Sequence, residues 1–578
     1  MRISLTLHHS RLPVLAALLS FLICNVVPAA TWGGNGVPLQ IKIDATDTVH
    51  KVFSVTEQIP LHGDASITLL YPRWEVASHA PTISVAEMAG LEFRVNGKAV
   101  AWHRDPLDVN EFHVALPQGA HVLEAHFDYL SPLKGGVMTR NIVQVQWEHL
   151  FLYPQGVNVD EIPVAAELRL PEGFQAASSL RVDHQEGADY HFKQCRLGYL
   201  ADSPVFAGRY LKSWPLSSNG TKTVWLHAVA DEARDLTVSA EELGKLRKLV
   251  EVTNGLFGDA PFEHYDFLVS LSDELPSDGG TEHQESSEIV LPADIFLKPD
   301  QYKTMASLFP HEYIHAWNGL HHRPAGMVVP NFNTPMQNSM LWVYEGLTEL
   351  YGLRIARDSA LITDEDYRDA LAMDAAEQLT RPGRRWKSLA DSDYDPIYLA
   401  GHHINWSDWE RREDYYQEGP LLWLGVDAEI RKATSGKSGL NAFVRAFFTG
   451  SNAHSAVEPY SFADLVTALN TIAAEPWQYY LQTRLNAHDG TYLTDALKFA
   501  GYALVFNATE SDMFAQQELE DGVLDLSYSI GARVRPNGVL QSVSWDGIAF
   551  KASLVPGMKI VAMNGEAFTI AALRRRLQ

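Results

Sequence analysis

The chain has 578 residues, too many for one ordinary hydrophobic core, so its length predicts about two to four domains. With 46% hydrophobic and 20% charged residues, it has the composition of a globular protein and not of a disordered one. Its net charge of −25 argues against nucleic acid or an anionic membrane as the main partner, because both favour a basic face.

The first 30 residues predict a signal peptide. Residues 1–11 carry two arginines and no acid, residues 12–27 are almost wholly apolar, and Pro28-Ala29-Ala30 supplies the small residues of a cleavage site. The apolar run is shorter than the roughly 20 residues that a spanning helix needs. We therefore expect cleavage and a mature chain without an integral membrane span, with an uncleaved anchor as the alternative.

The two cysteines bear on the compartment. Cys24 lies in the predicted signal peptide, so Cys195 stands alone in the mature chain and no intrachain disulfide can form. An exported protein of this size without disulfides is more typical of a bacterial periplasm than of a eukaryotic exterior. We expect a bacterial protein that is periplasmic or secreted.

Residues 31–215 predict an N-terminal β-rich domain. Residues 40–44 and 144–147 alternate apolar and polar side chains, as strands do. Two short runs, residues 91–95 and 98–102, flank Asn96-Gly97, which is a hairpin signal. We find no stretch of useful length with helical periodicity, so a β-sandwich is the simplest architecture.

The pattern changes near residue 238 and is mainly helical to about residue 485, within a predicted catalytic domain over residues 216–500. Ser239 followed three residues later by Glu242 is a capping box, and the apolar residues after it have the spacing of an amphipathic helix.

Three alternating acids in this region, Asp391, Asp393 and Asp395, have the spacing that begins a calcium loop. The sixth position is Pro396, where an EF-hand needs glycine, so we expect an acidic surface loop instead.

Residues 505–578 differ again. Two predicted strands, residues 528–534 and 539–543, precede an Asn564-Gly565 turn and a short helix that begins near Thr569. This pattern resembles a PDZ domain, and an incomplete one, since a complete domain continues to a last strand. A small β-rich cap without a ligand is the alternative.

The strongest motif for chemistry is H-E-x-x-H at residues 311–315. On a helix, His311 and His315 share a face and can reach one metal ion, and Glu312 between them can act as a base on a water molecule. The alternative is two helix-surface histidines beside an ordinary glutamate.

A catalytic zinc needs a third protein ligand and an open fourth position. Glu345, thirty residues after His315, lies in a predicted helix with apolar flanks. Glu349 shares its face, so Glu345 could bind the metal while Glu349 orients a ligand histidine. Two histidines and a glutamate fit zinc best among the common ions, and we expect one Zn²⁺ per chain. A solvated acidic helix face is the alternative.

Four motifs in order resemble the glycyl aminopeptidase family of PDZ-containing gluzincins. Residues 311–324 (HEYIHAWNGLHHRP) are similar to its zinc helix, and residues 342–348 to the helix of its third ligand. Residues 279–283 (GGTEH) resemble its Gly-Gly-x-Glu-His strand, and residues 415–419 (YYQEG) its Tyr-Tyr-x-Lys-Gly stretch. The resemblance implies a multidomain α+β fold with a β-sandwich-like domain, a mainly helical thermolysin-like catalytic domain and a PDZ-like domain.

The resemblance also implies roles for single residues. Tyr416 would stabilise the oxyanion, with Tyr415 as a rival, although Glu418 stands where the family has lysine. Glu282 would bind the substrate's terminal ammonium. Gly279, Gly280 and His283 would line the same substrate site, where His283 either contacts the substrate or packs.

We therefore expect a zinc aminopeptidase that removes small N-terminal residues such as glycine or alanine from peptides, a preference that only the resemblance implies. Two alternatives remain: a zinc endopeptidase with the same site, and a non-catalytic periplasmic protein that binds peptides. The sequence leaves the oligomeric state open.

Overall fold

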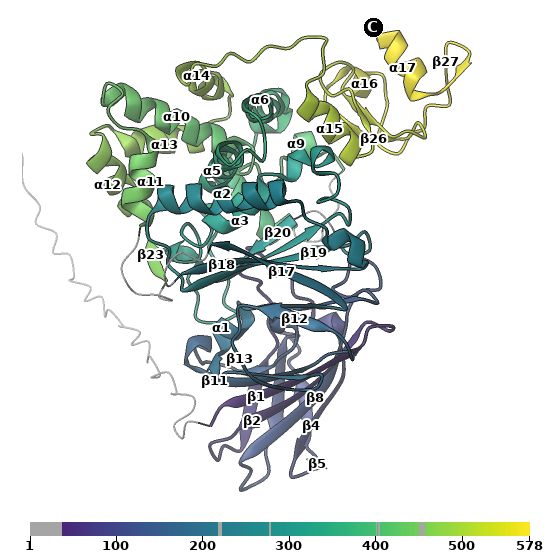
Figure 1. The fold of residues 1–578 in the computed structure, drawn as a ribbon, viewed down its shortest axis with the longest axis vertical. Helices are drawn as coiled ribbons and strands as arrows, with labels where there is room; N and C mark the ends of the chain where they lie inside the picture. Colours follow the sequence, from purple (N-terminus) through teal and green to yellow (C-terminus); the bar gives the residue numbers. More distant parts are fainter. Residues whose placement is uncertain are drawn as a thin grey trace, which may run out of the picture.

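The computed structural model describes residues 37–217, 222–276, 279–399, 402, 405–449 and 457–577. The chain has a multidomain α+β fold: a β-rich region lies at one end of its long axis, helices lie toward the other, and a five-stranded sheet lies between them (Figure 1). The predicted signal peptide lies outside the described residues. Within the described residues, no helix is long and apolar enough to cross a membrane.

The N-terminal region is built almost wholly from strands. They are β1 (Leu39–Asp47), β2 (Val52–Pro60), β3 (Ser66–Leu70), β4 (Met88–Val95), β5 (Lys98–Ala99), β6 (Trp102–Arg104), β7 (Glu111–Ala115), β8 (Val122–Leu130), β9 (Ile142–Val145), β10 (Tyr153–Pro154), β11 (Pro163–Arg169), β12 (Gln175–Ser178), β13 (Val182–Glu186), β14 (Asp189–Phe192), β15 (Cys195–Arg196) and β16 (Val205–Gly208), with the short helix α1 (Leu197–Ala201). They form a nine-stranded sheet, a four-stranded sheet and a three-stranded sheet.

Local sequence explains several strands of this region. Leu39, Ile41 and Ile43 of β1 are buried and the residues between them are exposed, which confirms the predicted alternation. The predicted hairpin is also present: β4 and β5 pair across Asn96 and Gly97, whose φ angles of 51° and 73° are the left-handed pair that a tight hairpin turn requires.

Strand β9 differs from the predicted pattern, because all four of its residues are buried. Gln144, expected to face water, donates a hydrogen bond from Nε2 to Ser270 Oγ at 3.0 Å. Ser270 lies on a strand of the next sheet, so β9 packs with one face on the N-terminal core and the other on the catalytic region. The partner that satisfies the buried amide comes from elsewhere in the chain.

The central sheet has the order β17-β18-β19-β21-β20. Its strands are β17 (Tyr210–Ser217), β18 (Thr223–Ala230), β19 (His264–Leu271), β20 (Gly279–Glu282) and β21 (Ser286–Leu291). Strands β18, β19 and β21 run parallel, and β20 is an antiparallel edge strand. The sequence predicted a mainly helical segment here, but β19 is a short run buried on both faces, and periodicity alone does not separate such a strand from a buried helix.

Helices cover this sheet. They are α2 (Ala240–Phe257), α3 (Leu308–Ile314), α4 (Leu341–Tyr344), α5 (Gly346–Asp358), α6 (Asp364–Thr380), α7 (Leu389–Ser392), α8 (Asp395–Leu399), α9 (Ser407–Glu410), α10 (Glu418–Ala433), α11 (Leu440–Phe448), α12 (Phe462–Ile472), α13 (Trp477–Leu485) and α14 (Thr491–Phe499), with a parallel pair of short strands, β22 (His322–Pro324) and β23 (Glu458–Tyr460). Helix α2 begins after Ser239, whose Oγ accepts from the Glu242 amide at 3.0 Å, while the Glu242 carboxylate pairs with Lys245. Half of the predicted capping box therefore forms.

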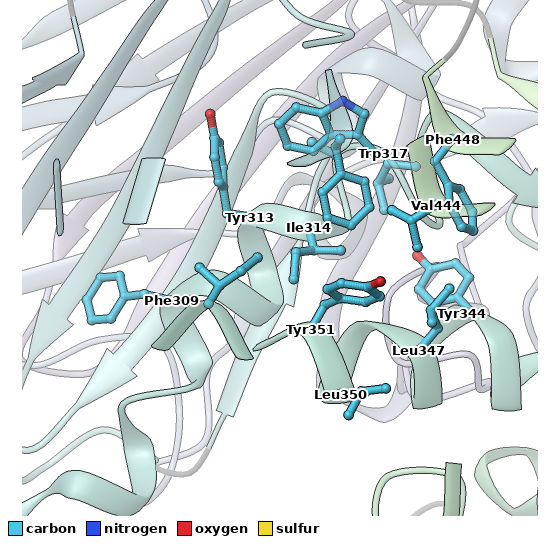
Figure 2. Packing of buried hydrophobic residues seen from close by; sticks show 14 of the residues in the cluster. Phe309, Tyr313, Ile314, Trp317, Tyr344, Leu347, Leu350, Tyr351, Val444 and Phe448 are labelled. Carbon is cyan, nitrogen blue, oxygen red and sulfur yellow. The ribbon is translucent and has the colours of Figure 1, made fainter. Parts of the chain in front are cut away.

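Helices α3 and α5 are held in place by a buried apolar cluster (Figure 2). Tyr313 of α3 packs edge to face against Tyr265 of β19, with ring centroids 4.9 Å apart. Tyr351 of α5 packs against Phe257 in the same way at 5.9 Å. Because a close-packed core resists displacement, the cluster fixes α3, which carries His311, relative to α5, which begins directly after Glu345.

The C-terminal region contains α15 (Asp512–Glu520), β24 (Leu524–Asp525), β25 (Ala532–Val534), β26 (Leu540–Val543), α16 (Ile548–Lys551), β27 (Ala562–Met563), β28 (Glu566–Ala567) and α17 (Ile570–Leu577). It has a small hydrophobic cluster of its own. Trp545 stacks on Trp409 at 5.3 Å and packs edge to face on Trp406 at 5.4 Å, and its amide donates to Asp408 Oδ2 at 2.6 Å. These contacts attach the C-terminal region to the helical region.

The three alternating acids do not form the predicted surface loop. Asp391 is exposed, but Asp393 and Asp395 are fully buried. Asp395 forms an ion pair with the buried Lys387 and accepts from the Glu413 amide at 2.8 Å. The prediction of a surface loop was wrong for these two residues. The charge on Asp395 is compensated by a lysine and a backbone amide, and burial raises the pKa of Asp393 well above its ordinary value, which favours the uncharged acid.

Candidate metal centre

The H-E-x-x-H motif lies on α3, a helix of seven residues. The helix begins at Leu308, so Pro310 lies in its first turn, where a backbone amide has no partner within the helix. His315 follows the last helical residue but keeps helical backbone angles, φ −59° and ψ −23°. His311 and His315 therefore still share one face.

Glu345 lies between α4 and α5. Its φ of −93° and ψ of −50° continue the helical path, its amide donates to the Leu341 carbonyl at 2.7 Å, and its carbonyl accepts from the Glu349 amide at 2.8 Å. The residue is 1% exposed. The predicted single helix is thus two helices whose hydrogen bonding continues across their junction.

The structure brings these three predicted ligands together. His311 Nε2 lies 3.0 Å from His315 Nε2 and 3.2 Å from Glu345 Oε2, and His315 Nε2 lies 3.5 Å from the same oxygen. Ligand atoms about 2.0–2.1 Å from a tetrahedral zinc ion lie roughly 3.3 Å from one another. The donor atoms therefore have the spacing that a zinc ion needs.

Hydrogen bonds at the other ring nitrogens strengthen this fit. His311 Nδ1 donates to Glu349 Oε2 at 2.8 Å, and His315 Nδ1 donates to the Asn318 carbonyl at 2.9 Å, because both partners can only accept. When both imidazoles are neutral, as metal ligands must be, their Nε2 atoms carry lone pairs that face each other. Two facing lone pairs and a carboxylate oxygen require a cation between them, and a metal ion fits.

The charged groups around the histidines also favour a cation at this point. Burial lowers the pKa of His311, but hydrogen bonds to Glu345 and Glu349 outweigh burial, and the pKa is raised well above its ordinary value. Burial raises the pKa of Glu345, but His315 and His311 outweigh burial and hold this pKa well below its ordinary value. The site therefore favours an ionised carboxylate and bound positive charge.

Glu312 faces the same space from α3. It is 3% exposed, its Oε2 has no hydrogen-bond partner within the described residues, and burial raises its pKa to about 7 against the opposing effect of His311 and His315. One of its oxygens lies within 4.8 Å of ligand atoms of His315 and Glu282. A buried carboxylate with a free oxygen beside the metal ligands can accept a proton from water.

The edge strand β20 passes over Glu312 and carries predicted substrate residues. A Cβ built on Gly280 would lie 2.6 Å from Glu312 Cγ and closer still to its carboxylate, whereas a Cβ on Gly279 would meet nothing within 4 Å. Only glycine lets the strand approach this closely at residue 280. Glu282, 5% exposed, ends the strand and accepts a hydrogen bond from the Tyr344 hydroxyl at 2.6 Å.

His283 lies next to Glu282, and its ring contacts two carboxylates that are not metal ligands. Its Nδ1 is 3.2 Å from Asp202 Oδ1, and its Nε2 is 3.1 Å from Glu288 Oε1. Burial lowers the pKa of His283, but these two carboxylates outweigh burial and raise the pKa well above its ordinary value. Because both ring nitrogens are engaged, the geometry favours packing over contact with a substrate.

The two candidate tyrosines differ in their access to the centre. The ring of Tyr416 lies 6.1 Å from that of His311 and is half-buried. Tyr415 packs against Tyr416 at 4.8 Å and is 1% exposed. Burial, followed by the charge of Glu345, raises the pKa of Tyr416 well above its ordinary value, so its hydroxyl stays protonated and can donate.

Glu418, the residue that departs from the family pattern, is fully buried. Its Oε2 accepts from Arg411 Nη2 at 2.6 Å and pairs with Arg384, and its Oε1 accepts from the Tyr492 hydroxyl. Arg411 in turn pairs with Asp414. The acid is therefore compensated by two arginines, and this network flanks the turn that carries Tyr416.

One neighbour of the centre was missed by the sequence analysis. His79, from the N-terminal region, places Nε2 2.7 Å from Glu345 Oε1. No local motif marks this histidine, because its partner is 266 residues away in the chain.

Two family models match the chain. The model of the Peptidase M61 N-terminal domain matches residues 40–209, and the model of the M61 glycyl aminopeptidase matches residues 304–422. The second range contains His311, His315 and Glu345. A comparison with curated protein sequences gives no match.

One solved structure shares the fold, and two others match the chain with lower scores. An aminopeptidase N family protein from Idiomarina loihiensis matches with a TM-score of 0.76 and 19% identity, over 93% of this chain and 91% of that chain. A mutant M1 zinc metallopeptidase from Deinococcus radiodurans, bound to a Tyr-Ser-Ala substrate, matches with a TM-score of 0.46 and 15% identity, over 78% and 93%. Yeast LTA4 hydrolase in complex with bestatin matches with a TM-score of 0.45 and 14% identity, over 82% and 68%.

We expect Glu418→Gln to destabilise the protein by about 3 kcal/mol, because it removes a buried anion on which two arginines depend. Thermal unfolding measures the change as a lower Tm. The matched control is Glu429→Gln on the same helix α10, whose partner Lys432 is exposed and whose loss costs under about 0.5 kcal/mol. Equal effects of the two variants would contradict the role given to the buried network.

Proposed function

This chain belongs to the M61 glycyl aminopeptidase family and is a metallopeptidase of the aminopeptidase type, and we propose that it removes small N-terminal residues, such as glycine or alanine, from peptides. The observation that carries the proposal is the convergence of two imidazole nitrogens and one carboxylate oxygen, 3.0–3.5 Å apart, beside the buried Glu312. The family favours exopeptidase action over the endopeptidase and peptide-binding alternatives.

In this proposal His311, His315 and Glu345 hold one Zn²⁺ per chain. When bound, the ion supplies a Lewis acid that polarises the scissile carbonyl and makes water more acidic. Glu349 keeps the His311 ring in the orientation that presents Nε2, and the Asn318 carbonyl does the same for His315. These ligand and orienting roles are supported by the hydrogen bonds of both rings.

Glu312 acts as the general base. Its free oxygen takes a proton from the attacking water and later gives it to the leaving amine, so the carboxylate ends each turnover as it began. Tyr416 donates a hydrogen bond to the oxyanion that forms on the carbonyl oxygen. Its greater exposure and its proximity to His311 support Tyr416 over Tyr415.

Glu282 binds the terminal ammonium of the substrate. A carboxylate close to the metal ligands accepts a charge-assisted hydrogen bond from a free amine and discriminates against a blocked one. Gly279 and Gly280 leave the edge of β20 open to the substrate backbone, as edge strands allow. His283 supports this edge through Asp202 and Glu288.

We also propose that the protein is exported and has three domains. Residues 1–30 export the protein to the periplasm or beyond, and residues 31–215, 216–500 and 505–578 are the β-sandwich-like, thermolysin-like and PDZ-like domains. The order of β24, β25, β26, α16, β27, β28 and α17, with an Asn564-Gly565 hairpin turn, supports the PDZ-like fold.

The proposal is tested with free-amine and N-acetylated peptides, with and without chelation. We expect hydrolysis of free-amine peptides only, with glycine and alanine preferred, and complete loss after chelation. Glu312→Gln is expected to lower kcat by about 10²–10⁴-fold while zinc content stays at one per chain. Cleavage of acetylated peptides would contradict the role of Glu282, and full activity of Glu312→Gln would contradict the base.

Gly280→Ala is expected to lower kcat by about 100-fold with little effect on stability, because the new methyl group displaces the flexible Glu312 carboxylate and not the backbone. Gly279→Ala, whose methyl group would meet nothing within 4 Å, is the matched control and is expected to keep full activity. Steady-state kinetics and thermal unfolding of the two variants check this. Equal kcat values would contradict the role given to the close contact between residue 280 and Glu312.

Tyr416→Phe is expected to lower kcat by about 10²–10³-fold with KM nearly unchanged, since only the transition state uses the hydroxyl. Tyr415→Phe is expected to keep kcat within roughly tenfold of the wild type, because its ring is packed behind Tyr416. The two variants are compared under saturating substrate. The reverse order of effects would assign the oxyanion to Tyr415.

A further inference from the structure

His79 reaches the catalytic region from the N-terminal one. It lies in the loop between β3 and β4, close to an isolated bridge between Glu75 and Ala80. The residue is 2% exposed. Its φ of 53° is in the left-handed region, which residues other than glycine rarely adopt. Such a conformation persists only where surrounding contacts hold it.

The imidazole contacts the carboxylate of Glu345 on the side away from the histidine ligands. Oε2 of Glu345 faces His311 and His315, whereas Oε1 lies 2.7 Å from His79 Nε2. An ionised carboxylate can only accept, so His79 donates through Nε2. This hydrogen bond fixes the carboxylate plane and determines which oxygen remains for a metal ion.

The rest of His79 contacts the segment that leads to Glu345. Its carbonyl accepts from Asn338 Nδ2 at 2.8 Å, and Asn338 itself accepts from the Leu341 amide, where α4 begins. The His79 ring packs edge to face on Tyr344, with centroids 4.8 Å apart. His79 therefore holds both ends of the short helix α4.

We propose that His79 is a positioning residue for the metal ligand Glu345, so that the N-terminal region completes the zinc site of the catalytic region. This inference rests on the proposed zinc site. It gives the N-terminal region a role beyond covering the central sheet. Partners of this kind typically contribute about 10–100-fold to metal affinity.

A packing role makes a different prediction from a hydrogen-bonding role. His79→Phe keeps an aromatic ring against Tyr344 but removes the donor. His79→Gln loses the ring but carries an amide nitrogen with nearly the reach of Nε2. A positioning role requires the phenylalanine variant to be impaired and the glutamine variant to recover, whereas packing alone requires the opposite order.

The experiment measures the zinc dissociation constant of the full chain by competition with a chromophoric chelator. We expect His79→Phe to raise the Kd for zinc by about 10–100-fold and His79→Gln to restore it to within about threefold of the wild type. The matched control is His149→Phe, because His149 is also in the N-terminal region, packs against Tyr129 at 5.1 Å and does not contact Glu345. This control is expected to bind zinc like the wild type.

Each outcome bears on the inference. Wild-type affinity in His79→Phe would overturn it, and so would a glutamine variant as weak as the phenylalanine variant. If circular dichroism shows that His79→Phe does not fold, His79→Asn takes its place, because its amide is too short to reach Glu345 and the same loss is expected. A wild-type chain that binds no zinc would instead refute the proposed function.

Discussion

Two imidazole nitrogens 3.0 Å apart, each with its proton on the far side of the ring, are the constraint on which the rest of the catalytic region depends. Glu349 and the Asn318 carbonyl hold these protons away from the centre, and Glu345 adds a carboxylate oxygen. Without a cation this arrangement is repulsive. With one it forms a three-ligand site that leaves a position open for water and substrate.

Separate parts of the fold meet at this point. Helix α3 and the residue that caps its end supply the histidines, and the α4 and α5 junction supplies Glu345. The edge strand β20 supplies Gly280 and Glu282, and the N-terminal region supplies His79. The aromatic cluster between α3 and α5 fixes the helices. Individual side-chain hydrogen bonds can then set the orientation of the metal ligands. The glycine at residue 280 allows the strand to lie against the base.

The sequence predicted those features that lie within a single helix or turn. His311 and His315 are one helical turn apart, and Asn-Gly turns mark hairpins, so both follow from local geometry. Glu345 was predictable from motif context. His79 was not, because it meets Glu345 only through packing of regions 266 residues apart. The compensation of Glu418 by arginines and the buried strand β19 were missed for the same reason: each depends on tertiary partners that no local pattern encodes.

The proposed activity depends on His311, His315 and Glu345 holding one zinc ion between them. The most direct measurement is anomalous X-ray diffraction from crystals of the protein, recorded on both sides of the zinc absorption edge. We expect one strong peak per chain, about 2.0–2.2 Å from His311 Nε2, His315 Nε2 and a carboxylate oxygen of Glu345. A zinc-containing crystal with its peak elsewhere, or with these three side chains turned apart, would contradict it.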